Sequence, residues 1–426
     1  MNQRLILSLD ENANFSYLKC SKFKSDLISF NMFLPLEREK VSRFAVLPGI
    51  LAHECAMYPT FVEFNKKIEE LYGANISTDI SKIGDYQLLS IYASSINKKF
   101  TIEKSDIMSE LSDLLIELVF NPNIDSVNGF NDLTVAIEKH ENIENIKAEL
   151  NDKRCYSLAQ CDRLIFGNQK GSINKYGDID EINKITPKIM LETYKEVIST
   201  AHIEIMMISD IAYDEIYEKF KNKISKIDRK PKIIFKNELK KHENCKIKRK
   251  NEVMDVSQSK LVIGCTTEVA APSDEMFAMS LVSYILGGTL NSKLFLNVRE
   301  KLSLCYYCSS HYTKSIGMFY IESGVEFKNL EQAEIEILNQ LESIKSGDIT
   351  DEELSNVLKY ITQIFKSTED SLSGIESWYI YQIVSGLAYT PDEFSNRISK
   401  VTKEEIVKTS QKVKVNCVYI LSNQPV

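Results

Sequence analysis

The stretch at residues 294–307 reads Leu-Phe-Leu-Asn-Val-Arg-Glu-Lys-Leu-Ser-Leu-Cys-Tyr-Tyr. It places Arg299 at the end of an expected helix and Tyr306, seven residues later, at the start of an expected strand. Arginine is much rarer in this chain than lysine, and its planar guanidinium fork has a donor geometry that lysine cannot supply. Taken alone, the pattern favours a surface arginine paired with Glu300 and a half-buried tyrosine.

Helices and strands are expected on both sides of this stretch and along the whole chain. Four threonines stand three residues before a glutamate and mark helix starts: Thr60, Thr350, Thr390 and Thr402. Further helices are expected at 105–120, 126–150, 273–286 and 330–345. Runs rich in Ile, Val, Tyr and Phe predict strands at 4–9, 26–34, 86–94, 202–209, 260–266, 318–325 and 416–422. The sequence therefore predicts a mixed α+β fold.

The two halves of the chain look alike. Leu71 and Gly84 match Leu304 and Gly317 at one offset of 233 residues, and each glycine opens an apolar strand. Each half also ends with a Thr-started helix and an apolar strand. Chance similarity between amphipathic segments is the alternative, but agreement in order and spacing favours an internal duplication. We expect a first half at 1–220, a basic linker at 221–252 and a second half at 253–426.

The composition describes an ordinary globular protein of two or more domains, with 426 residues that are 43% hydrophobic and 26% charged. A formal charge of −8 disfavours a nucleic-acid-binding protein, and the lysine-rich segment 219–250 has few of the aromatic residues that such surfaces use. No run approaches the ~18 apolar residues of a membrane span. Because the nine cysteines are odd in number and scattered, we expect reduced thiols and a cytoplasmic location.

Two incomplete metal motifs stand out. His53-Glu54 begins a His-Glu-x-x-His zinc pattern, but a methionine occupies the place of the second histidine. Cys305 and Cys308 form a lone Cys-x-x-Cys pair. A second pair, His242 and Cys245, would complete a zinc set on paper, but the apolar and aromatic neighbours of Cys305 favour structural thiols on a buried strand.

A third motif is the Gly-Gly-Thr-Leu-Asn-Ser-Lys run that ends at Lys293. It resembles a phosphate-binding loop only loosely, because Ser292 stands where the glycine before the lysine should be. A helix end followed by a helix start is enough to explain its glycines. By motif alone, the sequence contains no self-sufficient active site.

The stretch Leu286–Tyr307 resembles the second half of the insulinase/pitrilysin family, which includes the mitochondrial processing peptidases. The pattern Phe-x-x-Val-Arg-Glu-Lys-x-x-Leu-x-Tyr, which begins at Phe295, matches the family signature there. Ser303 and Cys305 depart from it, because the family usually has glycine and a small residue at these places. The resemblance covers practically the whole chain. It implies two homologous halves, each a mostly antiparallel sheet with helices packed on it.

Active members of that family bind zinc through an inverted His-x-x-Glu-His motif in the first half. With Tyr58-Pro59-Thr60 as the anchor, those places fall near Ala45, Pro48 and Gly49, none of which can bind a metal. We also expect Pro48 and Gly49 to disrupt the helix that would present the ligands. The helix expected to supply a third ligand carries Glu138, Glu141 and Glu144, which we interpret as a solvated face. This chain is therefore expected to hold no catalytic zinc.

In the same family the second half supplies an arginine and a tyrosine that bind the substrate backbone and steady the oxyanion formed on water attack. Carried over, these residues are Arg299 and Tyr306, and both side chains are hydrogen-bond donors. Some bacterial members are heterodimers in which one subunit carries zinc and the other carries the Arg/Tyr pair. The chain is most similar to the second kind, including a subgroup associated with aminopentanol modification of elongation factor P.

The resemblance therefore implies a subunit of a zinc endopeptidase that is inactive alone and needs a partner. The partner would be a homologous subunit with a His-x-x-Glu-His motif and the zinc, and the substrate would be a peptide. A homodimer of the isolated chain is also possible. The alternative is a catalytically inactive structural or peptide-binding protein, which the family also contains.

Overall fold

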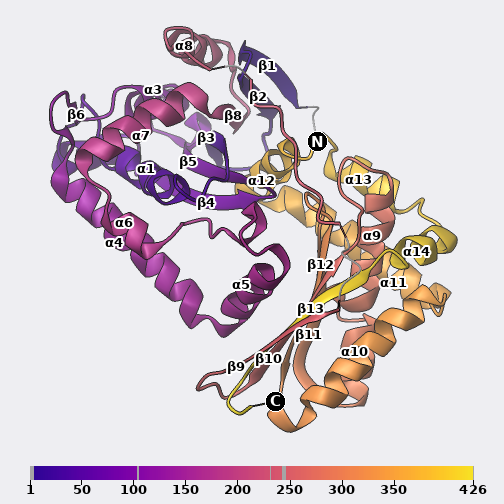
Figure 1. Ribbon diagram of the computed structural model, residues 1–426. Coiled ribbons are helices and arrows are strands. Elements are labelled where there is room, and N and C mark those ends of the chain that lie inside the picture. Colours follow the sequence, from indigo (N-terminus) through magenta and orange to yellow (C-terminus); the bar gives the residue numbers. More distant parts are fainter. Residues whose placement is uncertain (1–3, 103–104, 231, 242–245, 426) are drawn as a thin grey trace. The chain divides into compact units, whose positions relative to one another are not determined.

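The computed structural model describes residues 4–102, 105–230, 232–241 and 246–425. These residues form two compact units. Unit 1 comprises residues 1–148, 173–234 and 371–380, and unit 2 comprises 149–172, 235–370 and 381–426. Each unit is an α+β body built on one large sheet, so the predicted fold class is confirmed (Figure 1).

The sheet of unit 1, here sheet 1, has the strand order β1-β2-β8-β3-β5-β4. β2 and β8 run parallel, whereas all other neighbours are antiparallel. Its strands are β1 (Leu5–Asp10), β2 (Ala13–Lys19), β3 (Ser25–Pro35), β4 (Asn75–Ile83), β5 (Tyr86–Ile96) and β8 (His202–Ser209). A separate short ribbon joins β6 (Ile124–Asp125) and β7 (Gly129–Phe130).

The sheet of unit 2, here sheet 2, has the order β11-β12-β10-β13-β9. Again one pair is parallel, β9 with β13, and the rest are antiparallel. Its strands are β9 (Lys248–Val253), β10 (Ser259–Thr266), β11 (Cys305–Thr313), β12 (Met318–Val325) and β13 (Lys414–Ser422). Five strands of sheet 1 have counterparts in sheet 2 with the same order and directions: β2, β8, β3, β5 and β4 correspond to β9, β13, β10, β12 and β11. β1 has no counterpart among the described strands of sheet 2.

Helices cover the sheets. In unit 1 they are α1 (Val41–His53), α2 (Phe61–Glu70), α3 (Ile107–Phe120), α6 (Ile179–Asn183), α7 (Pro187–Thr200), α8 (Asp214–Ile224) and all but the last turn of α4 (Asp132–Asn151). In unit 2 they are α5 (Lys153–Phe166), α9 (Glu275–Ser283), α10 (Leu330–Lys345), α11 (Asp351–Ser367), α13 (Pro391–Ile398), α14 (Lys403–Ser410) and the wider turns η3 (Tyr284–Gly288) and η4 (Leu294–Lys301). α12 (Leu372–Ile383) begins in unit 1 and ends in unit 2.

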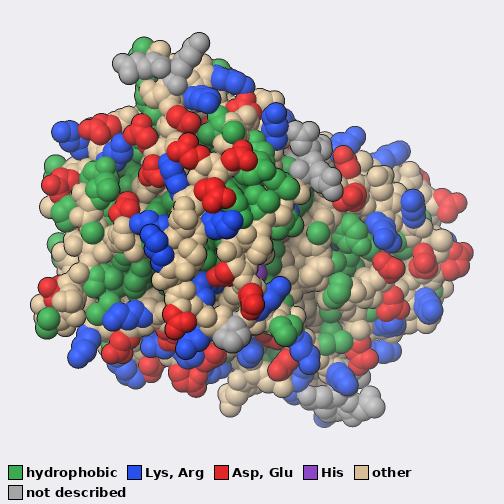
Figure 2. Space-filling model, turned by 90° about the horizontal axis from the view of Figure 1, so that it is seen from above, with side chains coloured by type: hydrophobic (Ala, Val, Ile, Leu, Met, Phe, Trp, Pro, Cys, Tyr) green, Lys and Arg blue, Asp and Glu red, His purple; other side chains and the backbone are tan. Residues whose placement is uncertain are grey.

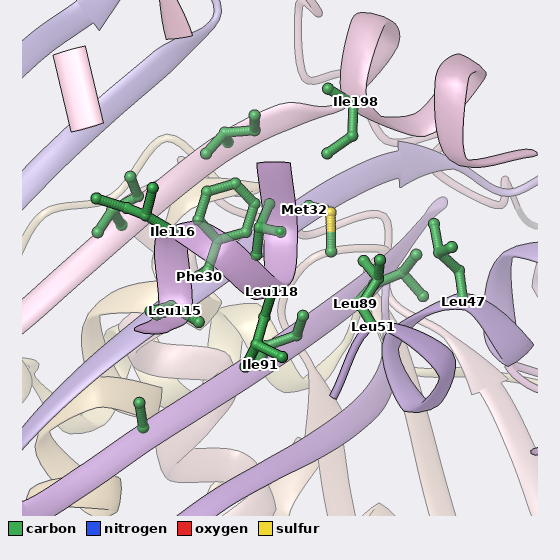
Figure 3. Close-up of a cluster of buried hydrophobic side chains, with 14 of the residues drawn as sticks. Phe30, Met32, Leu47, Leu51, Leu89, Ile91, Leu115, Ile116, Leu118 and Ile198 are labelled. Carbon is green, nitrogen blue, oxygen red and sulfur yellow. The ribbon is translucent and has the colours of Figure 1, made fainter. Parts of the chain in front are cut away.

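The core of unit 1 forms because β3 and β5 place apolar residues on the face that α1, α3 and α7 cover. Phe30 and Ile91 meet Leu115 and Leu118 of α3, and all four are buried (Figure 3). Burial of one such side chain is worth about 1.5–3 kcal/mol, so this packing outweighs local sequence preferences.

Helix α1 shows that effect. Pro48 and Gly49 were expected to disrupt the helix, and this prediction is wrong, because α1 runs unbroken through both residues. Proline removes one backbone donor within the helix. Phe44, Leu47 and Leu51 of the same helix are buried against the sheet, and their packing compensates for the lost hydrogen bond.

The opposite face of each sheet is covered by a helix from the other half of the sequence. On sheet 1, residues 371–380 of α12 belong to unit 1, and Glu376 accepts hydrogen bonds from Ser29 (2.7 Å) and Asn31 (3.0 Å) of β3. On sheet 2, α5 packs on β10 and β13. The two Arg154–Glu322 hydrogen bonds, of 2.7 and 2.5 Å, join α5 to β12.

The predicted helix caps are present. Thr350, Thr390 and Thr402 each form a capping box with the glutamate three residues later. Thr60 accepts from the backbone N–H of Glu63 at 3.2 Å. These caps form because the first backbone N–H groups of a helix have no acceptor within the helix, and the threonine side chains accept from them.

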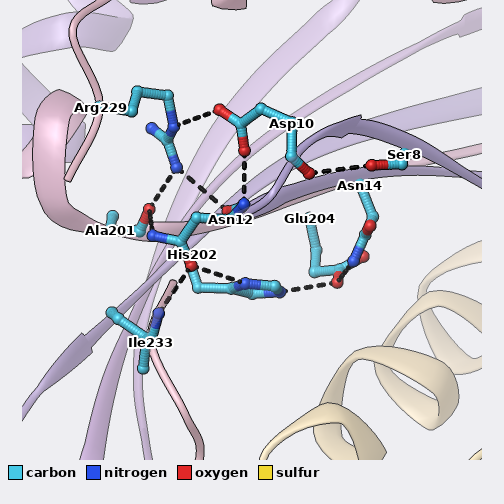
Figure 4. A network of polar contacts seen from close by, with 9 residues as sticks. All are labelled: Ser8, Asp10, Asn12, Asn14, Ala201, His202, Glu204, Arg229 and Ile233. Carbon is cyan, nitrogen blue, oxygen red and sulfur yellow. Dashed lines mark hydrogen bonds and ion pairs between the residues drawn. The ribbon is translucent and has the colours of Figure 1, made fainter. Parts of the chain in front are cut away.

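The segment expected as a linker, 221–252, begins in α8 and ends in β9 of sheet 2. Between them, Arg229 is fixed to unit 1 (Figure 4): its Nε lies 2.7 Å from Asp10 Oδ2, and its Nη2 donates to the carbonyls of Asn12 and Ala201. The side chain of Asn12 also accepts from the N–H of Ile233. The chain leaving unit 1 is thus tied to the turn between β1 and β2.

On the face shown in Figure 2, acidic and basic side chains are interspersed. Among the helices of the described residues, none has the length and apolar character needed to cross a bilayer.

Candidate functional site

The Arg299–Tyr306 stretch lies in unit 2, between η4 and β11. η4 ends because Ser303 adopts a left-handed backbone conformation with φ of 51°. The N–H groups of Leu302 and Leu304 then reach back to the carbonyls of Asn297 and Val298. Such an ending usually uses glycine, and Ser303 stands where the family usually has one. Serine in place of glycine keeps the same backbone turn, but its backbone is strained in the left-handed conformation.

Tyr306 is the extra residue of a β-bulge. Cys305 pairs with Val325 and Tyr307 pairs with Gly324, so Tyr306 has no partner of its own on β12. A bulge redirects a side chain, and Tyr306 is 58% exposed. Its hydroxyl donates to Glu326 Oε1 at 3.2 Å. The phenol is therefore presented at the surface of unit 2.

Tyr307 is fixed differently. Its ring lies 5.0 Å from the Arg154 guanidinium and 5.3 Å from the Lys260 ammonium. Burial raises the pKa of Tyr307 above its ordinary value. A Cβ on Gly324 would overlap this ring, so the glycine makes room for it. Of the two tyrosines, Tyr306 is the one free to approach another molecule.

Arg299 has only weak restraints. Its guanidinium lies 4.6 Å from the ring centroid of Phe295 and 3.7 Å from Glu300 Oε1, and its side chain is 40% exposed. The Glu300 pair agrees with the simple surface interpretation of the sequence. An exposed pair of this kind contributes about 0–1 kcal/mol to stability, so the guanidinium can exchange it for another acceptor.

Cys305 precedes Tyr306 in the sequence and lies within reach of the Arg299 charge. A hydrogen bond with Cys308 is the main cause that lowers the pKa of Cys305 to about 7, with smaller contributions from Ser323 and the positive charge of Arg299. Arg299 is thus close enough to act on the residue next to Tyr306. Cys305 and Cys308 are both buried, as expected for structural thiols.

The region corresponding to the family's zinc site is occupied by other contacts. Ala45, Pro48 and Gly49 lie on α1. A Cβ added to Gly49 would overlap the carboxylate of Glu138 on α4. This carboxylate lies 2.8 Å from His53 Nε2. The three family positions do not fit a zinc ion, because Ala45, Pro48 and Gly49 have no ligating side chain and the Glu138 carboxylate fills the space beside Gly49.

Glu138 also corrects one expectation. Glu141 and Glu144 are exposed, as a solvated face requires, but the Glu138 side chain is largely buried. Its hydrogen bond raises the pKa of His53, which favours an ionic pair between α1 and α4. Sequence reasoning missed this pair, because 85 residues separate the two members and no motif connects them.

Of the remaining candidates from the sequence, Lys293 has a structural role. Lys293 is buried and lies 2.9 Å from Glu353 at the start of α11, so its charge is already paired. His242 and Cys245 lie outside the described residues. Within the described part of the chain, no group of three or more His, Cys, Asp or Glu side chains is arranged to hold a metal ion.

Comparison with known proteins agrees with this picture. Residues 184–360 match the family described as the Peptidase M16 inactive domain. The probable inactive metalloprotease YmfF of Bacillus subtilis (strain 168) is 28% identical over 406 residues, which cover 95% of this chain and 94% of that protein. An uncharacterized zinc protease, YmxG of the same organism, is 26% identical over 136 residues, 31% of this chain and 33% of the relative.

The fold has solved counterparts. A conserved protein from Enterococcus faecalis V583 superposes over 100% of both chains with a TM-score of 0.88 at 23% identity. The family match, the full-length relative and the two-sheet architecture agree with the resemblance read from residues 286–307. Residues 184–360 thus match the M16 inactive-domain family, and the whole chain is similar to a relative described as a probable inactive metalloprotease.

Proposed function

We propose that this protein is the non-catalytic subunit of a heterodimeric zinc endopeptidase and that it contributes Arg299 and Tyr306 to peptide binding and oxyanion stabilisation. The zinc and the general base belong to a homologous partner with a His-x-x-Glu-His motif. The bulge at Tyr306 carries this proposal, because it turns the phenol to the surface of the unit that also exposes the Arg299 guanidinium.

The chemistry of the pair suits this role. A guanidinium and a phenol are both donors, and neither is consumed by a strong internal interaction. Removing one hydrogen-bond donor from the place where negative charge develops lowers kcat by about 10²–10³-fold. A division of labour also accounts for the lack of ligating side chains at Ala45, Pro48 and Gly49, beside which the His53–Glu138 pair lies.

The alternative, an inactive structural or peptide-binding protein, has one observation in its favour. Both donors already have partners within unit 2, Glu300 for Arg299 and Glu326 for Tyr306. Under this alternative, the two residues only shape the surface. The two functions differ in what happens to turnover when the donors are removed.

The test is reconstitution with zinc-bearing M16 subunits and a peptide library. Arg299→Ala and Tyr306→Phe should each reduce kcat by about 10²–10³ while complex formation stays unchanged. Tyr307→Phe is the matched control, because the Tyr307 ring is packed against Arg154 and Lys260 of its own unit, and it should leave kcat nearly unchanged. Full turnover by the Arg299→Ala complex, or no turnover with any zinc-bearing partner, contradicts the proposal.

A further inference from the structure

Two cysteine side chains meet where α5 covers sheet 2. Cys161 lies on α5 and Cys417 lies on β13, and 256 residues separate them in the sequence. Their Sγ atoms are 3.1 Å apart, and both residues are fully buried. The Cys417 thiol also lies 3.8 Å from the carbonyl oxygen of Cys161. Because both residues belong to unit 2, the contact lies within one compact body.

A glycine of the sheet makes room for the two sulfur atoms. Gly264 of β10 pairs with Cys417. A Cβ added to Gly264 would lie 2.7 Å from Cys161 Sγ and 3.0 Å from Cys417 Sγ, and it would also overlap Ile165 of α5. The backbone of Gly264 is not in the left-handed region, so its conformation does not require a glycine. The close approach of the two sulfur atoms and Ile165 explains instead why a larger residue does not fit here.

Packing holds the two thiols in place. They belong to a buried cluster whose other members include Ile165, Phe166, Val262, Met318, Tyr320, Tyr419 and Leu421. Polar contacts hold the same helix, since Arg154 of α5 is bonded to Glu322 and Asp162 of α5 accepts from Tyr320. Folding therefore brings the two thiols together at high effective concentration, and no further loop has to close before they can react.

Little movement separates this contact from a covalent bond. The sulfur atoms of a disulfide are about 2.05 Å apart, so Cys161 Sγ and Cys417 Sγ must approach by about 1 Å from their separation of 3.1 Å. The hydrogen bond with Cys417, together with burial, raises the pKa of Cys161 well above its ordinary value. Because the thiolate is the reactive form, the closed structure protects the pair, and an oxidant reacts with it when α5 opens locally.

We propose that Cys161 and Cys417 form a reversible disulfide that locks α5 onto β13, with a small-molecule disulfide such as oxidised glutathione as the oxidant. One cysteine thiolate attacks the oxidant, so a mixed disulfide forms and one reduced glutathione leaves. The second cysteine thiolate attacks the protein sulfur of the mixed disulfide and releases the second reduced glutathione. The two cysteines thus lose two protons and two electrons, which the oxidant takes up. The proposed peptidase function is not involved, because neither Arg299 nor Tyr306 takes part.

Oxidation of the unmodified full-length chain tests the pairing. Hydrogen exchange of the α5 amides first gives the time within which this helix opens, and the chain is then incubated with oxidised glutathione for longer than that time. After alkylation of the remaining thiols, peptide mapping should find Cys161 linked to Cys417, and dithiothreitol should remove the link. Cys265 is an internal control, because it follows Gly264 and so points to the opposite face of the sheet. No link between 161 and 417, or an equal link between 265 and 417, overturns the inference.

The stability of α5 tests the consequence of the bond. Oxidation should slow the exchange of the α5 amides at least about tenfold, because the disulfide opposes detachment of the helix. Cys417→Ala should remove this difference between the oxidised and reduced chains, whereas Cys155→Ser, at an exposed position of the same helix, should keep it. Similar melting temperatures of the reduced proteins would show that both variants fold. Equal α5 exchange in the linked and reduced forms of the unmodified chain overturns the lock.

Discussion

Five strands of sheet 1 have the same order as the five strands of sheet 2, yet different polar groups hold the helix that each sheet receives from the other half of the sequence. On sheet 2, α5 is joined by the charged Arg154–Glu322 pair and by Tyr320, whose hydroxyl donates to Asp162 at 2.6 Å. On sheet 1, α12 is joined by one buried acid, Glu376, which accepts from neutral donors. A fold of this kind fixes where a helix docks, but it leaves open which polar groups secure it.

The largest expected effect is at Arg154. Arg154→Ala leaves Glu322 buried without its counter-charge, which costs about 2–3 kcal/mol after allowance for the half-exposed arginine. Hydrogen exchange of the α5 amides should accelerate accordingly. Lys147→Ala, which removes an exposed pair with Glu144, should change the free energy of unfolding by less than about 0.5 kcal/mol. An unchanged α5 exchange rate would show that the charged pair does not hold this helix.

The second effect depends on pH. Burial raises the pKa of Glu376 from 4.5 to about 7. Between these values the unfolded chain has released this proton and the folded protein retains it, so stability should fall as pH rises from about 4.5 to 7 and then level off. The loss is of order 3 kcal/mol.

Glu376→Gln should remove this pH dependence, because the amide keeps an acceptor for Ser29 and carries no charge. At pH 8 the variant should be more stable than the unmodified chain, and at pH 4.5 the two should be similar. Urea unfolding followed by exchange of the α12 amides measures both. Glu69→Gln, at an exposed position of α2, is the control. A pH profile that survives in Glu376→Gln would assign the titration to another group.

A smaller loss of stability is expected when the N-cap threonines of α7 and α14 are removed, the helices that precede the last strand of each unit. Thr186 caps α7 by accepting from Ile189 N–H, whereas Thr402 caps α14 within a full capping box. Each change to alanine should cost about 1 kcal/mol, and Thr402→Ala should cost more because Glu405 also loses its reciprocal arrangement. Equal losses in thermal unfolding would mean that the second hydrogen bond of the box adds nothing.

The smallest effect is at the helix ends before β4 and β11. Gly73 ends α2 with φ of 67°, and Ser303 ends η4 with φ of 51°. Ser303→Gly should stabilise unit 2 by about 0.5–1 kcal/mol, because serine is strained in this conformation. Gly73→Ala should destabilise unit 1 by a similar amount, since nothing crowds the added methyl group and only the backbone resists. Thermal melts of the two variants should shift in opposite directions.

Sequence reasoning predicted the elements that carry strong local signals. The Thr–Glu caps, the apolar strands and helix 330–345 all appear where expected. It missed elements whose reason lies in tertiary contacts. α5 contains Arg154 and Asp162, whose partners are on β12, and nothing near them in the sequence reveals this. α1 was misjudged, because the burial of its apolar face outweighs one proline.

The candidate site divides in the same way. The places of Arg299 and Tyr306 follow from a short pattern, so the sequence could locate them on a helix end and a strand start. The bulge that exposes Tyr306 depends on how β11 pairs with β12, and the pairing of His53 with Glu138 depends on how α1 meets α4. The bulge and the ion pair each form between two segments that are distant in the sequence, so they could be recognised only in the three-dimensional structure.

The exchange of helices between the halves affects how the protein can be synthesised. Residues 371–380 belong to unit 1, so the ribosome must translate about nine-tenths of the 426 residues before the sheet that begins at Leu5 receives its last helix. At ~5–20 residues per second, Ser29 and Asn31 wait about 20 seconds or more for Glu376. During that interval the nascent chain exposes an unfinished sheet, which is the kind of surface that chaperones bind.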